Sequence, residues 1–81
     1  MEEQKVKQDQ IKIGANIRRI RKARGLGQTE LSSKLQLAGA DVTREALVKM
    51  ERGIQHISAS QLRALRDVLS TTYEELLKET P

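Results

Sequence analysis

Two short amphipathic helices separated by a glycine-containing break constrain the fold of this chain more than any other feature. Leu31 and Leu35 are four residues apart, and Leu47 and Met50 are three apart. Both spacings place side chains on one face of a helix. The break between them contains Gly39, which adopts a positive φ without steric cost. Because two short helices cannot bury both apolar faces alone, further helices must pack around them.

Three more helices are predicted in the flanking segments. Ile13, Ile17 and Ile20 recur at helical spacing within residues 11–24, and Gly25 follows as a C-cap. Two later capping signals mark helix starts, and each places a Ser or Thr three residues before a Gln or Glu. They are Ser58 with Gln61 and Thr72 with Glu75. No strand with sustained alternation is found, so the sequence predicts an all-α, compact five-helix bundle.

Length and composition point to one small domain over residues 11–79. Residues 1–10 mix both charges with a single valine, which is typical of a flexible N-terminal arm. We expect no membrane span and no signal peptide, because there is no run of roughly twenty apolar residues and no basic-then-apolar start. A cytoplasmic location is the expectation. With no cysteine and one histidine, we expect no disulfide, no metal site and no cofactor.

The net charge of +4 is concentrated before the two central helices. Such a basic segment fits either a polyanionic partner or an ordinary solvated helix face. For Arg18, Arg19 and Lys22 we favour the solvated face. The basic residues of the segment are Lys12, Arg18, Arg19, Arg21, Lys22 and Arg24.

Three stretches resemble the phage-repressor-like helix-turn-helix domains, also called the Xre or Cro/CI family: IRRIRKARGLGQTEL, LVKMERG and SASQLRALRDVLSTTYEELL. The resemblance implies a lambda-repressor-like DNA-binding domain. It also implies a small transcriptional regulator that binds double-stranded DNA as a homodimer, with repression favoured over activation. The single aromatic residue, Tyr73, offers no stacking platform for single strands, which also favours duplex DNA.

The turn between the two central helices departs from the family pattern. The family usually has a compact turn, often Gly-Val-Ser, whereas this chain carries roughly five extra residues through Val42. The lengthened helix-turn-helix turn leaves three outcomes open. The insertion, at residues 38–42, could lengthen the second helix, add a turn to the third, or present its own backbone to DNA.

The third helix would carry the base-reading residues, because the second helix of a helix-turn-helix lies in the major groove. Arg44 can donate two hydrogen bonds to guanine, and Glu45 can accept one from a cytosine amino group. Thr43 can touch a thymine methyl or a phosphate, and Lys49 can reach a base or a phosphate. The alternative for Thr43, Arg44, Glu45 and Lys49 is a solvated face.

Phosphate contacts are predicted at two helix ends. Gln28 and Thr29 open the second helix, where N–H groups and the helix dipole favour an anion, and the resemblance implies a backbone-positioning role for Gln28. Arg52 lies beside the end of the third helix and could meet a phosphate. The resemblance also implies a structural salt bridge between Arg21 and Glu51.

Two other functions are alternatives to DNA binding. The first is an antitoxin or adaptor whose fourth and fifth helices bind a protein partner. The second, an enzyme, lacks support, because we find no acid pair in a plausible cleft, no nucleophile with a base and no phosphate-cradling glycine loop. For a homodimer, we expect the contact at Leu76, Leu77 and their neighbours. The sequence leaves open the operator, the choice between repression and activation, and any effector.

Overall fold

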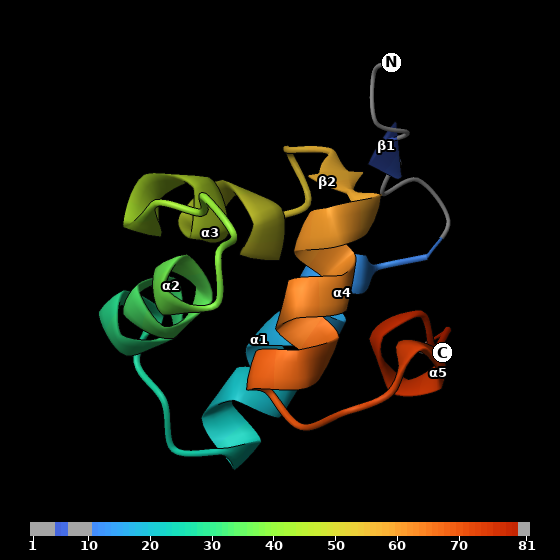
Figure 1. The fold of residues 1–81 in the computed structure, drawn as a ribbon. Coiled ribbons are helices and arrows are strands. Elements are labelled where there is room, and N and C mark those ends of the chain that lie inside the picture. The colour runs from blue at the N-terminus through green and yellow to red at the C-terminus, as the bar shows by residue number, and fades with distance from the viewer. Residues whose placement is uncertain (1–4, 7–10, 80–81) are drawn as a thin grey trace.

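Five helices and one pair of very short strands form the described part of the chain, residues 5–6 and 11–79, in a computed structural model (Figure 1). The predicted all-α five-helix architecture is confirmed. In Figure 1, α1 passes behind α4, with α2 and α3 on one side and α5 on the other. None of the described helices is long and apolar enough to cross a membrane. In chain order the elements are β1 (Lys5–Val6), α1 (Ile13–Ala23), α2 (Gln28–Leu37), α3 (Arg44–Glu51), β2 (Ile57–Ser58), α4 (Ala59–Val68) and α5 (Tyr73–Leu76).

The core consists of aliphatic side chains and one methionine contributed by all five helices. The apolar stripes predicted for the first three helices all point into it. Leu76 is fully buried as well, so its predicted role as a contact between two copies is wrong: α5 uses this side chain to close its own domain. The buried apolar residues are Ile13, Ile17, Ile20, Leu31, Leu35, Val42, Leu47, Met50, Ile57, Leu62, Leu65, Leu69 and Leu76.

The first four helices all end with a residue in the left-handed region. Gly25, Gly39 and Gly53 take this position after α1, α2 and α3, with φ values of 71°, 90° and 78°. Ser70 takes it after α4, with φ 52°. In each case the next residue donates its N–H to the carbonyl five positions earlier, which satisfies a carbonyl that the helix end would otherwise leave unpaired. The predicted stop at Gly25 and the predicted break around Gly39 both arise in this way.

Hydroxyl side chains start the last two helices. Ser58 Oγ accepts from the Gln61 N–H at 3.2 Å, and Gln61 Oε1 accepts from the Ser58 N–H at 3.0 Å, which is the predicted capping box. At α5, Thr72 Oγ1 accepts from the Glu75 N–H at 3.1 Å. The Glu75 carboxylate lies 3.5 Å from Arg19 on α1, so this acid also joins α5 to α1.

Strand β1 was not predicted. Lys5 lies opposite Ser58 and Val6 opposite Ile57 in an antiparallel pair with β2. The pairing partner is more than fifty residues away, and a two-residue strand has no alternation for a sequence pattern to reveal. The rest of the flexible arm predicted for residues 1–10 lies outside the described residues.

A buried asparagine ties α1 to the C-terminal segment. Asn16 is 1% exposed, and its Nδ2 donates to the carbonyls of Leu76 and Lys78, at 2.8 Å each. The Leu76 carbonyl ends a four-residue helix and the Lys78 carbonyl lies just beyond it; such a helix is too short to be stable without tertiary contacts. Asn16 therefore fixes α5 against the domain.

We expect Asn16→Ala to lower the free energy of unfolding by about 1 to 3 kcal/mol, because two carbonyls lose the donor that the Asn16 amide supplies. Urea unfolding followed by circular dichroism measures the change. Asn16→Asp keeps the side-chain size but replaces the amide donor with a carboxylate, so it should be at least as destabilising at neutral pH. Unchanged stability in both variants would show that this tether does not hold α5.

Candidate nucleic-acid interface

Val42 fixes the lengthened turn just before α3. Its side chain is fully buried, and its carbonyl accepts from Ser32 Oγ at 2.9 Å and from Gln36 Nε2 at 3.1 Å. Two side chains of α2 therefore hold the backbone at the point where α3 begins. Neither contact was predicted from the sequence. The available signal was their spacing, since residues 32 and 36 are one helical turn apart and share a face.

The insertion at residues 38–42 lies in the loop between α2 and α3. α2 ends at Leu37, so the insertion does not lengthen the second helix. α3 begins at Arg44, directly after Thr43, so no extra turn precedes the third helix. The loop between the helices is held at its end by Val42.

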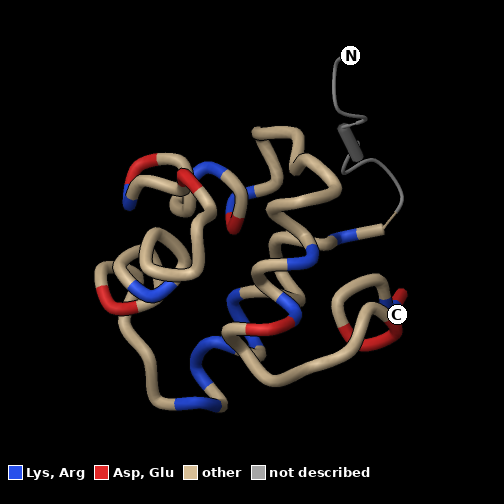
Figure 2. Tube along the Cα trace, in the orientation of Figure 1, with Lys and Arg blue, Asp and Glu red and all other residues tan. Residues whose placement is uncertain are grey.

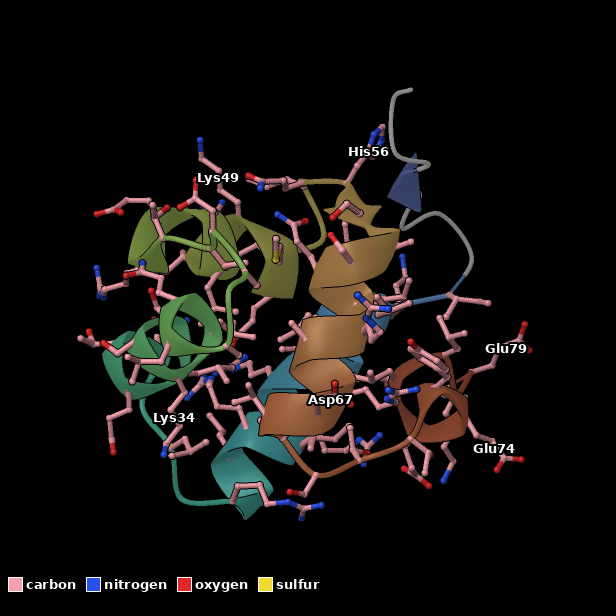
Figure 3. All side chains as sticks on the ribbon, in the orientation of Figure 1. Lys34, Lys49, His56, Asp67, Glu74 and Glu79 are labelled. Carbon is pink, nitrogen blue, oxygen red and sulfur yellow. The ribbon has the colours of Figure 1, made fainter. Side chains whose placement is uncertain are left out.

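The predicted base-reading residues lie on the outer face of α3. Arg44, Glu45 and Lys49 are exposed, and Lys49 points away from the helix in Figure 3. Thr43 is also exposed, but its hydroxyl caps α3 by accepting from the Ala46 N–H at 3.1 Å. Its methyl group and its hydroxyl proton are therefore the parts left for a contact.

The start of α2 meets the end of α3. Gly27 has the extended backbone of an N-cap, and Glu30 Oε1 accepts its N–H at 3.1 Å. Gln28 follows, half-buried, and its Nε2 donates to Glu51 Oε1 at 3.2 Å. Thr29 is exposed and faces solvent at the same helix start.

The structure brings Arg21 and Glu51 together in a two-pronged ion pair. Arg21 Nε lies 2.7 Å from Glu51 Oε2, and Arg21 Nη2 lies 2.9 Å from Oε1. Both side chains are almost fully buried, at 8% and 3% exposed. The hydrogen bond to Glu51 raises the pKa of the Arg21 guanidinium, against the opposing effect of burial. Arg21 Nη1 also donates to the Leu26 carbonyl at 2.9 Å, so one side chain joins α1, the segment before α2, and α3.

A basic depression surrounds this ion pair. It lies where α1, the start of α2 and the end of α3 meet, and three arginines and one glutamate contribute to its lining. In Figure 2, Lys and Arg positions run along α1 and also occur at both ends of α3. Arg18, assigned to a solvated face from the sequence, is one of the lining residues. The full lining is Arg18, Arg21, Gln28, Val48, Glu51 and Arg52.

An exposed, polar α3 set against α2 on a helical scaffold defines a helix-turn-helix DNA-binding domain. Comparison with known families agrees: residues 17–76 match the helix-turn-helix family, and the chain belongs to it. It is a DNA-binding transcriptional regulator of the Xre and Cro/CI type. The alternative of an antitoxin or adaptor is not favoured.

Several solved structures share the fold. The restriction-modification controller protein C.AhdI from Aeromonas hydrophila is 29% identical, with a TM-score of 0.71 over 84% of this chain and 91% of that one. The hypothetical transcription factor NHTF from Neisseria is 25% identical, with a TM-score of 0.73 over 98% and 85%. The clp gene regulator ClgR from C. glutamicum is 24% identical, with a TM-score of 0.73 over 84% and 81%. Comparison with curated proteins gives no match.

We expect Ser32→Ala to lower the free energy of unfolding by roughly 1 kcal/mol, because the Val42 carbonyl loses one of its two donors. Ser33→Ala is the matched control, since Ser33 is the next residue of α2 and is exposed. Urea unfolding of the two variants gives the comparison. Equal effects from Ser32 and Ser33 would mean that the hydroxyl does not support the turn.

Arg21→Met should cost about 3 to 5 kcal/mol of stability, because it leaves the Glu51 carboxylate buried without its cation. The double variant Arg21→Met with Glu51→Leu should recover much of that loss, since no charge is then stranded. Thermal and urea unfolding of the two single variants and the double variant complete the cycle. If the two losses simply add, the pair does not act as a unit.

Proposed function

We propose that the chain binds double-stranded DNA at a specific sequence by placing α3 in the major groove, and that it represses transcription there. The observation that carries this proposal is the division of α3 into two faces. Leu47 and Met50 are fully buried, whereas Arg44, Glu45 and Lys49 are exposed. A helix anchored in this way presents a fixed set of donors and acceptors to base edges.

The predicted roles of individual residues fit this arrangement. Arg44 sits at the first position of α3, where its guanidinium can donate two hydrogen bonds to guanine O6 and N7. Glu45 can accept from a cytosine amino group, and Lys49 lies one turn further along. Gln28, with Thr29 beside it, and Arg52 lie at the ends of α2 and α3 and supply contacts to the DNA backbone. We assign no catalytic role to any residue.

We further propose that the protein acts in the cytoplasm as a homodimer. A single α3 meets only a few base pairs, so two copies on half-sites about 34 Å apart would supply the required specificity. Leu76 is not available for the dimer contact, because it is buried within its own domain. C.AhdI and ClgR, which share this fold, are described as a controller protein and a gene regulator, in keeping with a role in gene control.

Replacing Arg44 with alanine should weaken binding to the cognate duplex by about 1 to 3 kcal/mol, because a base contact is lost. The measurement is fluorescence anisotropy with a labelled duplex from upstream of the protein's own gene and a scrambled duplex. Each duplex is titrated at two salt concentrations.

Arg63→Ala is the matched control, because Arg63 is an exposed arginine on α4, away from α3. It should change affinity far less than Arg44→Ala. Sedimentation of the complex should give two chains per duplex. Equal, weak binding of the wild type to both duplexes would argue against sequence-specific regulation at that site.

A further inference from the structure

We propose that Arg18 of α1 and Arg52 at the end of α3 close together on one phosphodiester of the DNA backbone, beside the Gln28 amide. This inference rests on the proposed function and adds a helix outside the helix-turn-helix to the DNA contact. The ligand is a phosphate of the duplex, recognised by charge and hydrogen bonding and not by base sequence.

The geometry points to this site because side chains of three helices line one depression. Arg18 comes from α1, Gln28 opens α2, and Arg52 follows the last residue of α3. Arg18 lies three residues before Arg21, so the two project from the same side of α1. Two cationic side chains, one on α1 and one just after α3, thus line the depression. They lie next to the N–H groups at the start of the ten-residue α2.

The charges of the depression are not balanced within the protein. Glu51 is the only acid that lines it, and its carboxylate is neutralised by the two-pronged pair with Arg21. Arg18 and Arg52 are exposed and take part in none of the ion pairs formed by the described residues. Two positive charges therefore remain for an anion.

Glu51 also orients the side-chain amide of Gln28, the uncharged residue of the site. A glutamine amide carries two N–H groups, and one of those on Gln28 donates to Glu51. The second is left for an acceptor in the depression. Arg21 holds Glu51 in place from the other side, so Arg21 and Glu51 are positioning residues and do not need to touch the DNA.

The neighbouring arginine shows that this role is not shared by the whole basic segment. Arg19 Nη2 lies 3.4 Å from Asn16 Oδ1 and 3.5 Å from the Glu75 carboxylate. Its guanidinium therefore forms an ion pair with α5. The adjacent residues Arg18 and Arg19 thus face different parts of the protein. Arg19 faces α5, and Arg18 lines the depression.

The test compares Arg18→Ala with Arg63→Ala, two variants that each remove one exposed arginine. Circular dichroism first checks that both fold. Anisotropy with a scrambled duplex over a range of salt concentrations then gives the slope of log K against log salt. Loss of one phosphate contact should reduce the magnitude of that slope by about 0.9 for Arg18→Ala. Arg63→Ala should reduce it by clearly less.

A second measurement locates the phosphate. Duplexes with a single uncharged methylphosphonate at successive positions should contain one position that weakens the wild type more than Arg18→Ala, in which Arg52 still contacts the phosphate. Equal slopes for Arg18→Ala and Arg63→Ala, or no such position, would overturn the clamp while leaving sequence-specific binding intact. A smaller slope for Arg18→Ala than for Arg63→Ala, without preference of the wild type for the upstream duplex, would support the clamp and count against the proposed function. No binding of the wild type to any duplex would overturn both.

Discussion

The ion pair between Arg21 and Glu51 is the interaction on which the rest of this structure depends. A single buried carboxylate accepts from Arg21 of α1 and from Gln28 of α2, and it belongs to the last residue of α3. Displacing any one of these helices would leave part of a buried charge unpaired, which is costly. A buried pair adds little net stability over apolar packing, so its main effect here is to fix how three helices meet.

The opposite end of α3 is fixed by different means. Val42 anchors the chain before the helix through its buried side chain and through a carbonyl held by α2. Thr43 then caps the first turn. With both ends held, the lengthened turn does not leave α3 free to change its angle to α2. DNA binding therefore would not carry the entropic cost of ordering this helix, which is the advantage of a preorganised reading surface.

The helices were predictable because their signals are local. Apolar spacing, the stop at Gly25 and the capping box at Ser58 each depend on residues within a few positions of one another. Most of the features that were missed join distant segments; the exceptions are the bonds from Ser32 and Gln36 to the nearby Val42 carbonyl. The Asn16 tether to the end of α5 spans some sixty residues, and the buried Leu76 lies at that helix end. In the candidate site, the exposed residues of α3 could be predicted from helix geometry. The place of Arg18 could not, because only the folded chain brings α1 beside Arg52.

The basic segment shows why net charge is a poor guide to a surface. Composition left two alternatives, a polyanionic partner or a solvated face, but the buried Arg21 follows neither. Arg19, Arg21 and Arg24 all bond within the protein, to acceptors on α1 and α5, to α3, and to the carbonyls at the end of α4, respectively. Much of the charge therefore holds the fold together. The position of each residue determines how much positive charge remains for DNA. Arg18 differs from its neighbour Arg19 only in the direction that the helix gives its side chain.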